Sequence, residues 1–216
     1  MPDRFAVPGT DWTLERITVG PLLMNAYLLS SAGAGEALLI DPGDEPERLL
    51  AAVDATGCRL TGLLSTHGHF DHISAASAIQ AAADLPLRHH PDETALVSHL
   101  NATRAAYGFP PAVPPRTAAD LTTAVPFAGG VIGVTHVPGH SPGHVMLTLP
   151  GHALVGDVIF YDSIGRTDLP GGSYEVLEAS ILNEVYVLDD ATVLHPGHGP
   201  ETTVAREAAE NPFVRR

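Results

Sequence analysis

The sequence contains no lysine: its 11 basic residues are all arginines, set against 25 acidic residues and a formal net charge of −14. Nucleic acids and anionic membranes attract clustered cations, so an acidic chain of this kind is not expected to bind either of them. The single cysteine, Cys58, cannot form an internal disulfide and is compatible with a reducing compartment. No run reaches the roughly 18–20 apolar residues of a membrane span, and the first residues lack the apolar core of a signal peptide. We therefore expect a cytoplasmic protein.

The 216 residues, of which 44% are hydrophobic and 17% charged, suffice for one folded domain with a sizeable core. Apolar runs of strand length alternate with segments of helical spacing in both halves of the chain. This pattern predicts an α/β fold, with two mixed β-sheets packed together, helices on the outer faces, and a single domain over 1–216. The proline-rich stretch 107–116 is interpreted as a surface excursion rather than a linker. Strands are expected over 12–20, 25–31, 36–43, 59–66, 86–90, 130–137, 144–150, 152–157 and 191–197, and helices over 46–57, 73–85, 91–108, 173–188 and 202–210.

Four short blocks rich in histidine and aspartate each follow a strand-like run. Ligand residues commonly lie at the carboxyl ends of strands in α/β folds. His67 and His69 are two residues apart and can point toward one ion, whereas Asp71 and His72 come a turn later and can face a second position. Imidazole suits zinc and iron, and carboxylate extends the choice to harder ions, so these blocks predict a metal site. The blocks are HGHFDH (67–72), VPGHSPGH (137–144), GD (156–157) and HPGHGP (195–200).

The order and spacing of these blocks, H-x-H-x-D-H, P-G-H, G-D and a second P-G-H, resemble the metallo-β-lactamase superfamily over residues 12–210. The resemblance implies an αββα sandwich that binds two divalent metal ions, zinc in the first place, with iron or manganese as alternatives. It also implies that a hydroxide bridging the two ions is the nucleophile, and that Asp71 is catalytic because it orients this hydroxide. By the same resemblance, the first ion is bound by His67, His69 and His140, the second by Asp71, His72 and His198, and Asp157 bridges both.

The stretch SIGRTDLPGGSYEVLEASI (163–181), with HPGHGPETT and NPFVRR, resembles the glyoxalase II-like branch, the hydroxyacylglutathione hydrolases, in its short bacterial form. The resemblance implies a small-molecule substrate, an S-(2-hydroxyacyl)glutathione thioester such as S-lactoylglutathione. Arg166 stands where that branch has a basic residue contacting glutathione, and a guanidinium can bind a carboxylate in bidentate fashion; a structural pairing with Asp168 or Asp162 is the alternative. Tyr161 and Tyr174 are candidate substrate-binding residues, with simple packing as the alternative. Asp168 replaces a tyrosine of that branch and the basic C-terminal tail is absent, which leaves the thiol carrier open.

Three other functions are compatible with parts of these motifs. Persulfide dioxygenases resemble the chain in the G-R-T-D segment at 165–168, but they bind a single iron through two histidines and an aspartate, and usually have cysteine or another residue in place of Gly68. A lactone, lactam or phosphodiester hydrolase would use the same pair of ions, although Asp157, where cysteine would be expected, disfavours β-lactams. A metal-dependent binding module without activity is the third alternative. The oligomeric state is not predicted.

Seven further histidines are expected to pack in the interior or to orient a metal ligand through its second ring nitrogen. His144 and His195 lie nearest the ligand blocks and are the candidates for the orienting role. The other five are His89, His90, His99, His136 and His152.

Overall fold

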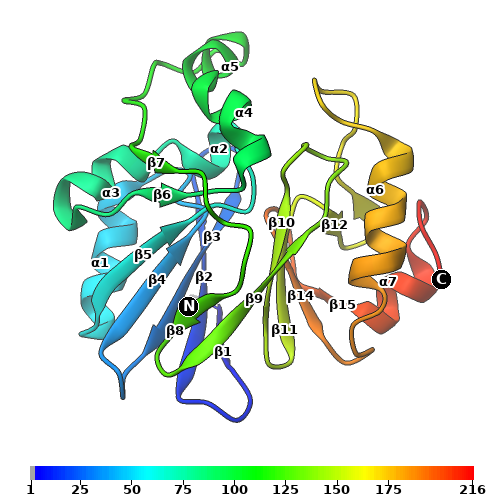
Figure 1. The fold of residues 1–216 in the computed structure, drawn as a ribbon, viewed down its shortest axis with the longest axis horizontal. Coiled ribbons are helices and arrows are strands. Elements are labelled where there is room, and N and C mark those ends of the chain that lie inside the picture. The colour runs from blue at the N-terminus through cyan, green and yellow to red at the C-terminus, as the bar shows by residue number, and fades with distance from the viewer. Residues whose placement is uncertain (1–2) are drawn as a thin grey trace.

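The computed structural model describes residues 3–216, which form two mixed β-sheets packed face to face (Figure 1). The strands of the first sheet are β1 (Asp3–Ala6), β2 (Trp12–Val19), β3 (Met24–Ser31), β4 (Glu36–Ile40), β5 (Arg59–Leu64), β6 (Leu87–Arg88) and β7 (Thr117–Ala118), in that spatial order. The neighbours from β1 to β4 are antiparallel, and those from β4 to β7 are parallel. Parallel neighbours need a crossover connection, which helices supply: α1 (Pro46–Thr56) joins β4 to β5, and α2 (Phe70–Ile73) and α3 (Ala76–Ala83) join β5 to β6.

The second sheet is built from the C-terminal half of the chain. Its spatial order is β15 (Thr202–Thr203), β14 (Val193–Pro196), β11 (His152–Gly156), β10 (Val145–Leu149), β9 (Gly130–His136) and β8 (Val125–Phe127). Only β11 and β14 are parallel neighbours. A separate hairpin consists of β12 (Ile159–Phe160) and β13 (Ser163–Ile164), and the sheet is followed on its outer side by α6 (Tyr174–Ser180), the π-helical turn η2 (Ile181–Val185) and α7 (Val204–Glu210).

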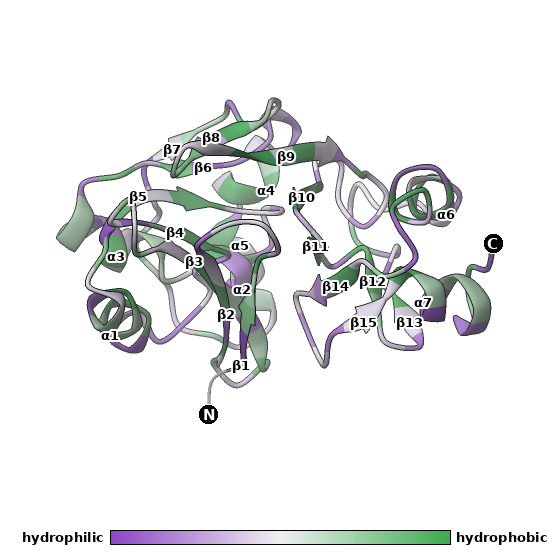
Figure 2. Cartoon of the chain, turned by 90° about the horizontal axis from the view of Figure 1, so that it is seen from below, coloured by the Kyte–Doolittle hydropathy of each residue, from purple (hydrophilic) through white to green (hydrophobic). Residues whose placement is uncertain are grey.

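Three apolar cores hold these layers together, and each belongs to one interface. Leu29 and Leu64 of the first sheet share a core with Leu147 and Leu154 of the second, so this core lies between the sheets. A second core packs the outer face of the first sheet against α1 and α3, and a third packs the second sheet against α6 and α7. Figure 2, which views the layers from below, shows these helix pairs on opposite outer sides. The prediction of two mixed sheets with helices outside is therefore confirmed.

Strand β3 is central to this arrangement because both of its faces are covered. Residues 24–29 are all buried, which explains why residues 26–29 form an apolar run instead of an alternating pattern. None of the helices within residues 3–216 is long and apolar enough to cross a membrane.

The largest departure from the predicted elements is at 91–108, where one helix was expected. The structure has a 3₁₀ turn, η1 (Pro91–Glu93), followed by two short helices, α4 (Thr94–Ser98) and α5 (Leu100–Ala106). The helices meet at His99, whose backbone lies outside the helical region (φ −91°, ψ 10°) and whose ring bonds to the carbonyl oxygen of Ala95. Spacing alone does not reveal this break, because the apolar pattern continues across it.

Candidate metal centre

All four predicted ligand blocks lie at the same end of the sheets. Strands β9, β11 and β14 of the second sheet run in the same direction, so the loops that follow them meet at one edge. After β5 of the first sheet, residues 67–69 lie in a loop and residues 70–72 lie at the start of α2. Figure 1 shows this edge at the top of the two sheets, below α4 and α5. Segments far apart in the sequence therefore contribute side chains to one site.

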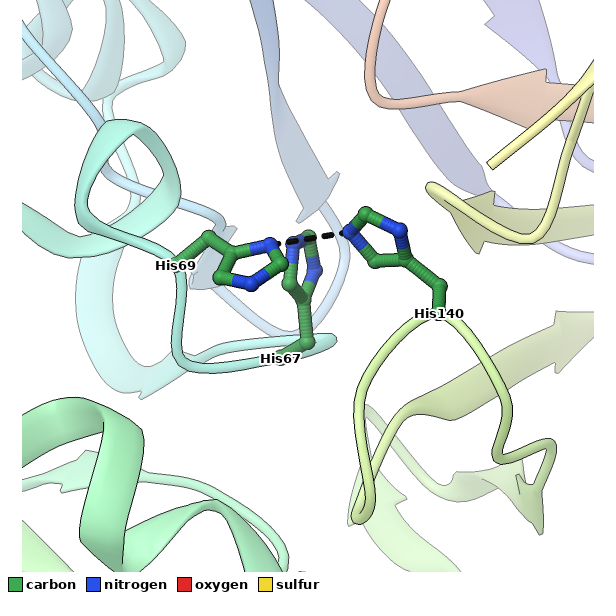
Figure 3. Close-up of side chains that lie close together, drawn as sticks. All are labelled: His67, His69 and His140. Carbon is green, nitrogen blue, oxygen red and sulfur yellow. Dashed lines mark hydrogen bonds between the residues drawn. The ribbon is translucent and has the colours of Figure 1, made fainter. Parts of the chain in front are cut away.

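The first group of side chains consists of His67, His69 and His140. One ring nitrogen of each lies within 4.8 Å of those of the other two. Nε2 of His140 is 2.9 Å from Nδ1 of His69, and Figure 3 shows the three imidazoles pointing toward one another from two different loops. His67 is fully buried. This is the set expected for a first ion.

The second group consists of Asp71, His72 and His198, again with one ligand atom of each within 4.8 Å of the others. Nε2 of His198 lies 3.2 Å from Oδ2 of Asp71. Asp157 connects the two groups: its Oδ1 is 3.4 Å from Nε2 of His72, and its Oδ2 is 3.7 Å from Nε2 of both His140 and His198. The structure thus brings all seven predicted ligands together.

Several buried polar atoms of these seven side chains lack a hydrogen-bond partner among residues 3–216. They include Nε2 of His67, Nε2 of His72 and Oδ1 of Asp157. A buried polar atom without a partner is costly, and such atoms usually mark a missing water or ion. Imidazole nitrogen and carboxylate oxygen suit zinc, iron and manganese. The residues present therefore fit two divalent cations with Asp157 between them.

Hydrogen bonds at the far side of two imidazoles leave their Nε2 atoms available for a cation. Asp41, which is buried, accepts hydrogen bonds from the backbone N–H and the hydroxyl of Thr66, at 2.7 and 2.8 Å. It also accepts from Nδ1 of His72 at 3.0 Å. Because the Thr66 hydroxyl donates to Asp41, its oxygen accepts from Nδ1 of His67, at 3.1 Å. Such outer hydrogen bonds fix the tautomer and ring orientation of metal-binding histidines.

Two backbone carbonyl oxygens orient the imidazoles of His140 and His198 in the same way. Nδ1 of His140 donates to the carbonyl oxygen of Arg166 at 2.8 Å, and Nδ1 of His198 donates to that of Leu22 at 3.1 Å. Nε2 of His144 accepts from the backbone N–H of Asp157 at 3.0 Å, so it contacts a candidate ligand at its main chain and not at a ring nitrogen. His195 instead pairs with His152 at 2.9 Å, which agrees with the packing role considered for it and not with the orienting role.

A buried carboxylate ties together two of the ligand loops. Glu93 is fully buried; its Oε2 accepts from the backbone N–H of Gly68 at 2.5 Å, and its Oε1 accepts from that of Gly143 at 2.6 Å. A Cβ at Gly68 would lie 3.0 Å from Oε2, and one at Gly143 would lie 2.9 Å from the backbone nitrogen of Glu93. Glycine at both positions therefore permits the close approach.

Sequence reasoning identified neither Asp41 nor Glu93 as part of the site. The place of Asp41 directly after the buried strand β4 is the one sequence feature that could have identified it. Glu93 follows no motif, and nothing in the local sequence marks it.

The ionisation states of the site follow from its burial and its charges. Burial acts to raise the pKa of Asp157, but the imidazoles of His72, His140 and His198 outweigh it and hold this pKa far below its ordinary value. Burial acts to lower the pKa of His72, but Asp157 and Asp41 raise it well above its ordinary value. For His67, burial and the neighbouring imidazoles both lower the pKa. Cation binding at these residues therefore competes with a proton on His72.

A cavity of about 240 Å³ opens over the centre, lined by ligand residues and by Leu22, Tyr107 and Arg166. The guanidinium of Arg166 makes two hydrogen bonds of 2.8 Å to Asp168 and one of 3.3 Å to the hydroxyl oxygen of Tyr107. Asp168 thereby has its pKa lowered to about 2. Arg166 thus lies at the cavity wall, as a substrate-binding role requires, but its charge is already paired with Asp168.

The structure places the two candidate tyrosines elsewhere. The ring of Tyr161 lies under the guanidinium of Arg206 at 3.6 Å, and the hydroxyl of Tyr174 donates to the carbonyl oxygen of Phe213 at 3.2 Å. Neither lines the cavity over the centre. The expectation that they contact substrate is thus corrected: both have structural partners.

Comparison with known proteins agrees with this geometry. The sequence model of the metallo-beta-lactamase superfamily matches residues 19–198. The probable metallo-hydrolase YqgX of Bacillus subtilis is 36% identical, over 93% of this chain and 96% of that protein. The hydroxyacylglutathione hydrolase GloC of Haemophilus influenzae is 34% identical, over 82% of this chain and 87% of that protein.

Among solved structures, the di-iron-bound form of TTHA1623 is 42% identical with a TM-score of 0.80, covering 92% of this chain and 99% of that one. The BLEG-1 B3 metallo-beta-lactamase is 35% identical with a TM-score of 0.83, covering 93% and 99%. The match of the family model over most of the chain and the complete set of seven ligand side chains lead to the same conclusion: the chain belongs to the metallo-beta-lactamase superfamily.

Proposed function

We propose that this protein is a metal-dependent hydrolase of thioesters of the S-(2-hydroxyacyl)glutathione type. The observation that carries the proposal is the dinuclear arrangement of ligands, in which Asp157 reaches both groups and its Oδ1 is left without a hydrogen-bond partner among the described residues. The similarity to GloC over most of both chains supports the choice of substrate class.

The two divalent ions, zinc in the first place, would be held by the seven side chains and would supply Lewis acidity and a water acidic enough to ionise near neutral pH. Asp71 lines the cavity and remains a carboxylate at neutral pH: burial acts to raise its pKa, but the hydrogen bond from His198 lowers it below its ordinary value. An ionised Asp71 can accept a hydrogen bond from a water and orient it toward a substrate carbonyl in the cavity.

The leaving group places a smaller demand on the protein. A free thiol has a pKa of about 8.5, so a thiolate departs near neutral pH without a strong proton donor. Arg166, paired with Asp168, lies at the cavity wall, where the thiol carrier of a bound substrate would pass. Its guanidinium has further N–H groups for a carboxylate or amide of that carrier.

The proposal is tested by metal analysis together with a panel of substrates. The protein is loaded with zinc, iron or manganese, and kcat/KM is measured for S-lactoylglutathione, for lactoyl thioesters of other small thiols, for a lactone and for a β-lactam. We expect two ions per chain and thioester hydrolysis, with neither in the Asp157→Ala variant. One iron per chain and oxygen uptake with glutathione persulfide would instead identify a persulfide dioxygenase, and tight metal binding without turnover would identify a binding module.

A further inference from the structure

A second, larger cavity adjoins the metal centre and is a groove of about 620 Å³. It runs between α4 and α5 on one side and Pro142 and residues 169–171 on the other. Figure 1 shows α4 and α5 facing the loop that leads into α6 across the top of the molecule. Of the seven candidate ligands only His69 lines this groove, and the proposed mechanism does not use it.

The groove is continuous with the cavity over the metal ligands. His69, Thr103, Tyr107 and Leu169 line both. His69 is itself one of the ligands of the first group, so a molecule whose reactive carbonyl lies at the centre can extend past His69 into the groove without leaving the protein surface. The groove is therefore placed to take part of a substrate.

The chemistry of the walls selects the kind of group that fits. None of the residues lining the groove is aspartate, glutamate, arginine or lysine. Ala102 and Ala106 are four residues apart on α5 and present methyl groups on one side, and Leu96, Pro142 and Leu169 complete an apolar lining. The polar side chains of the lining are those of His69, His99, Thr103 and Tyr107, none of them an acid or an arginine. A peptide-like carrier with several carboxylates and amides would therefore lose more hydrogen bonds to water than these few groups replace, which is unfavourable. An unbranched hydrocarbon chain would bury its surface at no such cost.

We infer that the groove binds an apolar chain of the substrate, and that the protein prefers 2-hydroxyacyl thioesters in which such a chain extends from the scissile thioester. The inference rests on the proposed function and narrows it. The apolar chain can be part of the acyl group or part of the thiol. Either one starts at the reactive carbonyl, and a hydrocarbon chain has the same apolar surface in both positions.

Two substrate series on the metal-loaded enzyme separate these sources. In the first, the thiol is N-acetylcysteamine and the acyl group lengthens from lactoyl through 2-hydroxyhexanoyl to 2-hydroxyoctanoyl. In the second, the acyl group is lactoyl and the thiol lengthens from methanethiol to octanethiol. Burial of each added CH₂ should raise kcat/KM by about two- to fourfold in one of the series until the groove is filled. Equal kcat/KM along both series would overturn the inference.

Substitutions on α5 supply a matched pair. Ala102→Phe fills the groove from an exposed position and should cut the advantage of the longest over the shortest substrate by about tenfold or more, with kcat/KM for the shortest substrate nearly unchanged. Ala105→Phe adds the same ring at an exposed position of the same helix that lines neither cavity, and should leave the ratio unchanged. If the ratio of kcat/KM for the longest substrate to kcat/KM for the shortest is the same in Ala102→Phe as in the wild type, the inference is contradicted. A dimer that Ala102→Phe dissociates, with no dependence on chain length, would assign the groove to a second copy of the chain.

A binding measurement keeps the inference separate from the proposed hydrolysis. The S-octyl and S-methyl thioethers of N-acetylcysteamine cannot be hydrolysed, and calorimetric titration compares their affinities directly. If no thioester of any length is hydrolysed, the proposed function fails, but tighter binding of the S-octyl compound that Ala102→Phe abolishes would still support the groove. Equal affinities of the two thioethers would overturn it.

Discussion

The contacts of the buried Glu93 carboxylate predict that replacing one of its oxygen atoms by an NH₂ group, at a position outside every sequence motif, weakens the metal centre. In Glu93→Gln the side chain keeps its shape, but one of its two acceptor oxygens becomes an NH₂ group. That group would face the backbone N–H of either Gly68 or Gly143, so one of the two hydrogen bonds is lost and two donors oppose each other. Hydrogen bonds to a charged group contribute about 1.5–3 kcal/mol each. We expect the free energy of unfolding of the metal-free protein to fall by about 2–4 kcal/mol.

Metal affinity should fall as well, because Gly68 lies between His67 and His69 and the loop containing Gly143 also carries His140. If the weakened bond frees about one backbone residue, ordering it again on binding costs about 1–2 kcal/mol. This corresponds to an affinity lower by about 5- to 30-fold. Competition with a chelator measures this affinity, and urea unfolding measures the stability.

Asp92→Asn is the matched control. It makes the same carboxylate-to-amide change at the adjacent position, where the side chain is 58% exposed and lies 3.7 Å from the ring of His90. We expect it to alter neither quantity by more than the error of measurement. A Glu93→Gln protein with the metal affinity and stability of the Asp92→Asn protein would refute the reasoning.

Three further predictions follow from the same contacts. Asp41→Asn should lower metal affinity by about 10- to 100-fold, because it removes the charged acceptor that orients His72; metal analysis after dialysis should then find less than two ions per chain, and full retention would contradict this role. Arg166→Ala should raise KM for a thioester by several-fold at unchanged metal content, because the backbone carbonyl that holds His140 remains; an unchanged KM would remove the side chain from substrate binding. The third concerns His195, whose pKa burial lowers to about 3 from an ordinary 6.5. Below pH 6.5 the unfolded chain therefore binds a proton at His195 that the folded chain does not bind. As the pH is lowered further, this residue reduces the free energy of unfolding by about 1.4 kcal/mol for each pH unit. Between pH 6.5 and 5 the advantage in unfolding free energy of the wild type over His195→Gln should shrink by about 2 kcal/mol, as urea titrations of the metal-free proteins will test, and a constant difference would exclude this residue as the source.

The gathering of the seven candidate ligands at one site could be predicted from sequence because each stands beside glycine or proline, or in the compact H-x-H-x-D-H block, directly after a strand-like run. The layers were predictable too, because strand-length apolar runs and helical spacing alternate. Glu93 was not, since its partners are 25 and 50 residues away in the chain and its contacts exist only once the loops have met. The contacts of Tyr161 with Arg206 are equally non-local, and so nearness to a motif in sequence was a poor guide to its place.

The seven ligands are divided between the two halves of the molecule. Four come from the segment that follows β5 of the first sheet, two from its loop and two from α2, and three, His140, Asp157 and His198, come from loops of the second sheet. Bound cations would consequently cross-link the two sheets at the seam, the boundary where the loops of the first sheet meet those of the second. Loss of metal would then weaken the contact between the sheets at that end. Amide hydrogen exchange should then quicken on both sides of the seam at once, while the opposite end, held by the apolar core between the sheets, keeps its protection.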